Sequence, residues 1–222
     1  MERDARRRHR DPLGGRERLR VGRRAAFPRG RLRLRLDTRD DRTLFFDLLP
    51  IDVGSIAGFN TRIQLYTVPG QVFYNTTRKL VLKGVDGVVF VADSQRPMLS
   101  ANVESLRNLE ENLGEMGLSL DTLPIVIQYN KRDLPDILSE EDIRLRWGGA
   151  PWPLLFAEAL GGRGVRETFA ALLGETWRAL DAEYGLAAQH GLDAAAFVAA
   201  ALGNSTGDMP WEARSASIAT SI

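Results

Sequence analysis

Hydrophobic residues gather along this chain in five short stretches that have the lengths of β-strands. The five stretches are residues 43–49, 61–67, 86–92, 124–129 and 153–157. The last three are almost continuously apolar, as expected of strands buried on both faces of a parallel sheet. Residues 62–66 instead alternate between polar and hydrophobic side chains, which indicates a half-buried edge strand.

Four helices are predicted in the intervals between and after these strands. They cover roughly residues 71–83, 98–116, 139–147 and 164–184. Ser139 is followed by three acidic residues, which is typical of a helix N-cap. With 222 residues and 44% hydrophobic content, the chain is expected to form one α/β domain with additional segments.

A tetrapeptide of the form N-K-x-D, residues 130–133, directly follows the fourth predicted strand. Guanine-nucleotide switches recognise their base with this motif, and ligands of open α/β sheets bind at the carboxyl ends of the strands. The Asp133 carboxylate could accept two hydrogen bonds from the N1–H and N2–H2 groups of guanine, which adenine does not offer. Asn130 would connect neighbouring loops, and the aliphatic stem of Lys131 would cover one face of the base.

Residues 67–71, with the sequence T-V-P-G-Q, lie at the end of the second predicted strand. Nucleotide switches carry D-x-x-G-Q there; the glycine N–H detects the γ-phosphate and the glutamine orients the attacking water. Gly70 and Gln71 match these positions, whereas Thr67 stands where the aspartate is expected. Taken alone, a Pro-Gly turn between a strand and a helix is the simpler interpretation. The N-K-x-D motif downstream favours the functional one.

Four segments together resemble the bacterial Mgl-type polarity and gliding-motility GTPases, a branch of the Ras-like small GTPases. These segments are residues 41–47, 65–74, 82–94 and 128–135. Threonine before x-P-G-Q is similar to that family's own pattern, so Thr67 strengthens the resemblance. The resemblance covers roughly residues 37–180. It implies a three-layer Ras-like P-loop fold, with a mostly parallel sheet that has one antiparallel edge strand.

The resemblance also implies roles for single residues. Arg42 matches an arginine finger supplied in cis, which neutralises charge on the transferred phosphoryl group; the alternative is a surface arginine paired with a nearby aspartate. Thr38 matches the position whose hydroxyl binds Mg²⁺, and Ala159 matches the position whose backbone N–H contacts guanine O6. Arg42 and Gln71 would then be catalytic, and the ligands would be GTP or GDP with Mg²⁺.

The phosphate-binding loop of this fold is missing or scrambled in the sequence. In the motif G-x-x-x-x-G-K-[ST], glycines expose backbone N–H groups, lysine reaches the β- and γ-phosphates, and Ser or Thr holds Mg²⁺. The three lysines of the chain are Lys79, Lys83 and Lys131, all downstream of the place for this loop near residues 5–15. Phosphate binding is therefore expected to be impaired, although the resemblance implies GTP hydrolysis.

The first 36 residues differ in composition from the rest of the chain. They hold fourteen arginines, no lysine and four acidic residues, a net charge of +10, whereas the other 186 residues have a net charge of −9. Three explanations stay open: a coding sequence translated out of frame or from a wrong start, a divergent arm, or a basic tail with its own ligand.

Only residues 31–36 of this segment alternate as a strand would. The first strand of a Ras-like sheet is buried on both faces, and three unpartnered arginines could not be buried there. At best these residues extend the edge strand at 44–46. The central strand position is therefore expected to be empty or poorly filled.

Several functional classes can be set aside. No apolar stretch approaches the roughly 18 residues of a membrane-spanning helix, and nucleic acid is not expected as a partner. The absence of cysteine permits a reducing cytoplasm, and the resemblance implies a cytoplasmic protein that can locate to a cell pole. It further implies a dimeric Mgl-type GTPase-activating partner and motility or polarity effectors.

The expected domains are an Arg-rich aberrant or disordered segment (1–36), a small GTPase domain (37–184), and an Ala-rich helix with a disordered tail (185–222). Two functions follow. One is a guanine-nucleotide switch for polarity and motility that hydrolyses GTP to GDP. The alternative is a non-catalytic, degenerate GTPase-fold interaction protein or a frameshifted gene model.

Overall fold

The computed structural model describes residues 18–21, 32–37, 43–68 and 75–204. Its strands are β1 (Arg18–Val21), β2 (Leu32–Asp37), β3 (Thr43–Ile56), β4 (Phe59–Thr67), β5 (Val88–Asp93), β6 (Ile125–Asn130) and β7 (Leu154–Phe156). Its helices are α1 (Asn75–Leu82), α2 (Leu99–Glu115), α3 (Glu140–Arg146), α4 (Val165–Tyr184), α5 (Leu186–His190) and α6 (Ala194–Asn204), with short 3₁₀ turns η2 (Arg96–Met98) and η3 (Ala159–Gly161). The prediction of an α/β, Ras-like fold is confirmed.

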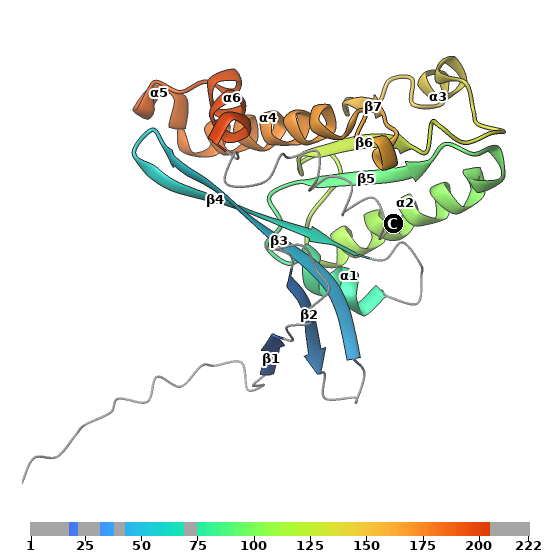
Figure 1. Cartoon of the computed structure of the whole chain (residues 1–222), viewed down its shortest axis with the longest axis horizontal. Coiled ribbons are helices and arrows are strands. Elements are labelled where there is room, and N and C mark those ends of the chain that lie inside the picture. Colours follow the sequence, from blue (N-terminus) through green and yellow to red (C-terminus); the bar gives the residue numbers. More distant parts are fainter. Residues whose placement is uncertain (1–17, 22–31, 38–42, 69–74, 205–222) are drawn as a thin grey trace, which may run out of the picture.

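The parallel sheet β5-β6-β7 forms the middle of a layered arrangement (Figure 1). Helix α4 covers one face of this sheet and α2 covers the other, with α1 packed against α2 and β3. On the α2 side, Ile125, Ile127 and Tyr129 of β6 share a buried cluster with Leu113. Burial on both faces explains why these strands are almost continuously apolar.

The described strands are divided between two sheets. The second sheet is antiparallel, in the order β1-β2-β3-β4. Strand β2 pairs antiparallel with β3 from Leu32 opposite Leu48 to Asp37 opposite Thr43, so residues 32–37 lie beside the predicted strand at 44–46 instead of extending it. Residue 31 lies outside the described residues. Among the described residues, no strand joins β4 to β5. The empty or poorly filled central strand stays a prediction, because residues 1–17 and 22–31 lie outside the described residues.

Strand β3 runs seven residues beyond the predicted end at residue 49. Pro50 pairs with Gln64 of β4, and among the described residues β2 pairs with β3 only as far as Leu48, so the other edge of β3 is unpaired at Pro50, where proline is tolerated. A tight turn at Ala57 (φ +49°) and Gly58 (φ +86°) then leads into β4. The long hairpin buries Ile51, Val53 and Ile56 in a second core, against α4 and α6.

The helices begin and end close to their predicted limits. Ser139 caps α3, because its Oγ accepts a hydrogen bond of 3.0 Å from the N–H of Asp142. In α4, Leu172, Leu173 and Trp177 are buried. The Ala-rich stretch forms α6, and its Phe197 ring stacks on Trp177 at 4.4 Å. None of the helices in the described segments has the length and apolarity needed to cross a bilayer.

Candidate functional site

Strands β5 and β6 end side by side, at the right-hand end of the molecule in Figure 1. Asp93 and Asn130, the last residues of the two strands, are opposite each other in the parallel register. The N–H of Ser94 continues the ladder by donating to the carbonyl of Asn130 at 3.0 Å. The N-K-x-D motif therefore lies at the carboxyl edge of the sheet, where open α/β folds bind their ligands.

Asn130 connects this edge to the loop after β7. Its side chain is buried, and Oδ1 accepts a 2.9 Å hydrogen bond from the backbone N–H of Ala159. The same loops are joined by the N–H of Arg132, which donates to the carbonyl of Ala157 at 3.1 Å. The structure thus brings together Asn130 and Ala159, which the sequence analysis selected separately. Their contact with a base stays a prediction.

Lys131 has an unusual backbone and a fixed side chain. Its φ of +64° lies in the left-handed region, which costs a non-glycine residue roughly 1–2 kcal/mol and is common at functional sites. Its Nζ lies 2.8 Å from Oδ2 of Asp93, whose side chain is only 11% exposed. This ion pair links Lys131 to the end of β5. That its stem covers a base stays a prediction.

Asp93 is a site residue that the sequence analysis did not select. Its Oδ1 accepts from the N–H of Gln95 at 2.9 Å, while Oδ2 faces Lys131. Its backbone N–H and C=O bond to the side chain of Asn102 at 3.0 and 2.8 Å. The signal for it was a carboxylate at the end of an apolar strand. Only the register of two strands 37 residues apart shows that it faces Lys131.

Of the remaining two residues of the motif, Arg132 has partners within the chain and Asp133 is exposed. Arg132 folds back, with Nη1 donating to the carbonyl of Leu138 at 2.6 Å and the guanidinium over the ring of Phe156. Asp133 is exposed, and within the described part of the chain no hydrogen bond or ion pair engages its carboxylate. Both of its oxygens are therefore available to donors from a ligand.

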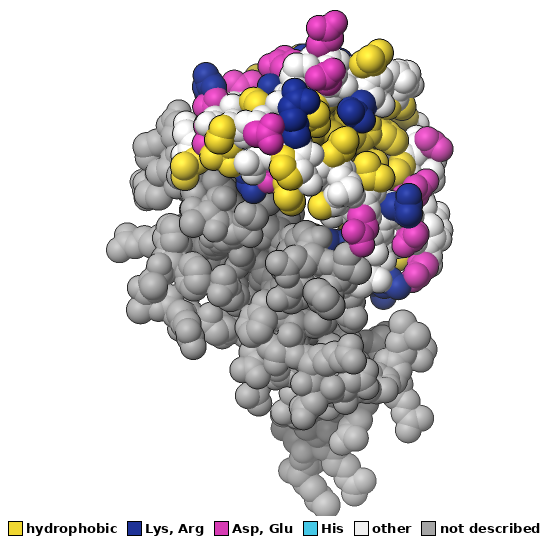
Figure 2. Space-filling model, turned by 90° about the vertical axis from the view of Figure 1, so that its right-hand side faces the viewer, with side chains coloured by type: hydrophobic (Ala, Val, Ile, Leu, Met, Phe, Trp, Pro, Cys, Tyr) yellow, Lys and Arg dark blue, Asp and Glu magenta, His cyan; other side chains and the backbone are white. Residues whose placement is uncertain are grey.

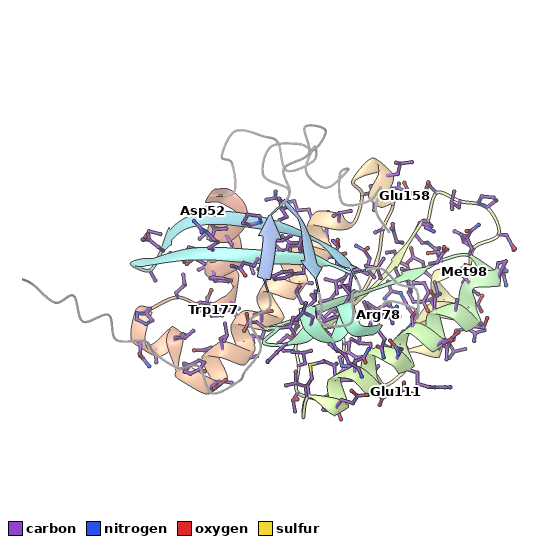
Figure 3. All side chains as sticks on the ribbon, turned by 90° about the horizontal axis from the view of Figure 1, so that it is seen from below. Asp52, Arg78, Met98, Glu111, Glu158 and Trp177 are labelled. Carbon is purple, nitrogen blue, oxygen red and sulfur yellow. The ribbon has the colours of Figure 1, made fainter. Side chains whose placement is uncertain are left out.

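The loop that carries Ala159 is stabilised from within. The N–H of Glu158 donates to the carbonyl of Arg163 at 2.9 Å, and the two side chains form an ion pair. Glu158 and Met98 lie at the same end of the molecule, and Asp52 and Trp177 lie at the opposite end (Figure 3). Figure 2 looks onto the end with the site, where side chains of both charges surround a hydrophobic area.

The residues predicted to act on the phosphates lie outside the described residues. These are Thr38, Arg42, Gly70 and Gln71. In the described segments, no group of three or more His, Cys, Asp or Glu side chains is placed to hold a metal ion. The described part of the chain thus includes Asn130, Lys131, Asp133 and Ala159 of the predicted site, and the binding of a base, phosphates or Mg²⁺ stays a prediction from the sequence.

Comparison with known proteins gives the family. No protein-family model matches the chain. The mutual gliding-motility protein MglA of Myxococcus xanthus (strain DK1622) is 55% identical over 148 residues, which cover 67% of this chain and 75% of that protein. With this identity over three quarters of the relative, the chain belongs to the Mgl-type family of Ras-like small GTPases.

Proposed function

We propose that this chain is a guanine-nucleotide switch for polarity and motility with a formed base-recognition end and impaired phosphate binding. The observation that carries the proposal is the 2.9 Å contact between Asn130 Oδ1 and the Ala159 N–H, at the carboxyl edge of the parallel sheet. The association with motility rests on the name of the relative, a gliding-motility protein. A cytoplasmic or polar location is part of the same proposal.

The base would be recognised by residues on two loops. The Asp133 carboxylate would accept the N1–H and N2–H2 donors of guanine, which gives specificity over adenine. Lys131, held by Asp93, would cover one face of the ring with its aliphatic stem. The Ala159 N–H donates to Asn130 Oδ1 in the structure. With a base bound, it would donate to guanine O6, either in a bond shared with Asn130 or after its bond to Asn130 is broken.

The reaction proposed for the family is hydrolysis of GTP to GDP. Gln71 would orient the attacking water, Arg42 would neutralise charge on the transferred phosphoryl group, and the N–H of Gly70 would contact the γ-phosphate. Thr38 would hold Mg²⁺, which would neutralise phosphate charge when bound. A dimeric Mgl-type protein would activate the reaction, and motility or polarity effectors would bind the GTP state.

One alternative has a specific observation in its favour. No lysine precedes Lys79 in the sequence, and β4 and β5 lie in separate sheets among the described residues. A non-catalytic interaction protein of GTPase fold, or a frameshifted gene model, would show both features. Translating the upstream DNA in all three frames distinguishes these, because an out-of-frame G-x-x-x-x-G-K-T would show that the coding sequence is damaged.

The proposal is tested by repair. In the repaired protein, a family-type strand and phosphate loop replace residues 1–36, and we expect GTP binding and hydrolysis to be recovered. There, Arg42→Ala and Gln71→Ala should each slow activator-stimulated turnover about 10³-fold or more. Arg62→Ala is the control, because Arg62 is exposed and pairs with Asp52 at the far end of the molecule.

Near-normal turnover in either variant would remove that residue from its catalytic role. A repaired protein that folds but binds no GTP would contradict the proposal and favour the non-catalytic alternative. Turnover is measured as phosphate release with and without the activating partner.

A further inference from the structure

A buried polar pair connects β6 to α4 behind the base-recognition end. Gln128 of β6 and Thr168 of α4 are 5% and 3% exposed. Nε2 of Gln128 lies 2.7 Å from Oγ1 of Thr168. An apolar pair would fill such a position in the core without the cost of burying two polar groups. The pair therefore needs an explanation beyond packing.

The hydrogen bonds of this pair have a defined direction. Oγ1 of Thr168 lies 2.6 Å from the backbone carbonyl of Gly164, which can only accept. The Thr168 hydroxyl must donate its single hydrogen to that carbonyl. Its oxygen then accepts from the Gln128 amide, so the bonds run from Gln128 through Thr168 to Gly164.

Gly164 is where this chain of hydrogen bonds reaches the site loop. Its φ is +73°, and a Cβ added there would lie 2.2 Å from the carbonyl oxygen of Phe156 and 2.9 Å from Cα of Ala157. The backbone at Gly164 is thus in close contact with the start of the loop 157–164. The position of Gly164 therefore helps to set the path of the whole loop, including Ala159.

Gln128 and Asn130 act on the same loop from one strand. They are two residues apart in β6, so their side chains project from the same face of the sheet, toward α4. Asn130 accepts from the N–H of Ala159 near the start of the loop. Gln128, through Thr168, holds Gly164 at its end.

We infer that Gln128 and Thr168 are positioning residues for the base-recognition loop. By holding Gly164, they keep the N–H of Ala159 in place beside Asn130. The inference rests on the proposed function only for the identity of the ligand, a guanine base. The positioning itself is a property of the chain without nucleotide.

Two substitutions at one position separate the hydroxyl from the packing. Thr168→Val keeps the shape of the side chain and removes both hydrogen bonds of the hydroxyl, to Gln128 and to the carbonyl of Gly164. Thr168→Ser keeps the hydroxyl. Backbone amide hydrogen exchange of the full chain, without nucleotide, is followed at Ala159, Gly161 and Gly162. We expect exchange about tenfold faster in Thr168→Val, the effect of losing a buried hydrogen bond, and near wild-type exchange in Thr168→Ser.

Leu173→Ala controls for general destabilisation of the same helix, because Leu173 belongs to the core shared with β3 and α6. It should lower the melting temperature without selective acceleration in the loop. Gln128→Met, which keeps a similar volume and loses the donor, gives the same test should Thr168→Val not fold.

Unchanged hydrogen exchange of the loop amides in Thr168→Val and Gln128→Met would overturn the inference. Faster hydrogen exchange spread evenly over α4, as in Leu173→Ala, would also overturn it. A GDP titration of the repaired protein separates this inference from the proposed function. If hydrogen exchange becomes faster only in the loop of Thr168→Val, and the repaired protein binds no guanine nucleotide, the positioning role is supported and the proposed function is overturned.

Discussion

Asp133 is the one residue of the N-K-x-D motif whose side chain has no partner in the described part of the structure. Asn130 bonds to Ala159, Lys131 pairs with Asp93, and Arg132 folds back onto the carbonyl of Leu138. If Asp133 served only to cap the loop after β6, its carboxylate would be expected to accept a backbone N–H nearby. Its exposure without such a bond leaves both oxygens free for the guanine donors in the proposed function.

Replacing Asp133 should change the preferred base in the repaired protein. In Asp133→Asn, one acceptor becomes an NH₂ donor that faces a donor of guanine. An unpaired donor costs roughly 1–3 kcal/mol, so GTP affinity should fall by about 5- to 150-fold. Xanthine has a carbonyl where guanine has N2–H2, so xanthosine triphosphate should bind better than GTP. Equal losses for the two nucleotides, measured by calorimetric titration, would show that Asp133 does not recognise the base.

Asp93 should matter for nucleotide affinity more than for stability. Asp93→Asn removes the charge that holds Lys131 while an amide oxygen can still accept from Gln95. Because the Lys131 side chain is 41% exposed, we expect a stability loss below about 1 kcal/mol. GDP affinity of the repaired protein should fall several-fold. Asp136→Asn is the matched control, because Asp136 pairs with Arg96 and both side chains are exposed.

Unfolding curves and GDP titrations on both variants decide the role of Asp93. An equal effect of Asp93→Asn and Asp136→Asn on GDP affinity would mean that the ion pair with Lys131 does not position the lysine for binding.

At the scale of the elements, local patterns were sufficient to find most strands and helices. The three apolar stretches became β5, β6 and β7, and Ser139 caps α3 as its acidic neighbours indicate. The full length of β3 was missed, because Pro50 is tolerated only where β2 has stopped pairing. Such a condition depends on the partner strand and is not visible in a local stretch of sequence.

The candidate site shows the same limit. Asn130 was found from the N-K-x-D motif and Ala159 by resemblance, but their contact joins residues 29 positions apart and depends on how β6, β7 and α4 are arranged. Asp93 was missed because its significance comes from the register with Asn130. Gln128 and Thr168 were missed because a polar residue in an apolar stretch has no local signature of its partner 40 residues away.

The start of α4 offers a direct test of loop geometry. Gly164→Ala would place a Cβ 2.2 Å from the carbonyl oxygen of Phe156, at a φ of +73° that disfavours any side chain. We expect a loss of roughly 2–4 kcal/mol, and so a melting temperature lower by about 4–16 °C. Gly161→Ala is the control, because nothing lies within 4 Å of a Cβ there and its φ is not positive.

Differential scanning calorimetry of the two glycine variants gives the result. A melting temperature for Gly164→Ala close to that of Gly161→Ala would mean that the loop can move away from α4 at no cost. It would also weaken the argument that Gly164 sets the path of the loop.

At the scale of the whole molecule, the two ends of a nucleotide would meet very different surroundings. The proposed base end lies at the carboxyl edge of β5 and β6, where a buried hydrogen bond and a half-exposed ion pair are formed. The phosphate end has no matching loop in the sequence, and no lysine precedes Lys79. The described strands are divided between two sheets, and the break lies between β4 and the β5 edge of the parallel sheet.

The central claim is that base recognition is formed in this chain while phosphate binding is impaired. It is tested most directly by an NMR titration of the isotope-labelled, unrepaired chain with GDP and with ADP. We expect GDP to shift the backbone amide of Ala159 and the side-chain amide of Asn130 with an affinity weaker than about 1 μM, because the phosphates supply most of the charge of a nucleotide and lack their binding loop. ADP should leave both signals unchanged. Submicromolar binding of GDP, or an equal response to ADP, would contradict the account.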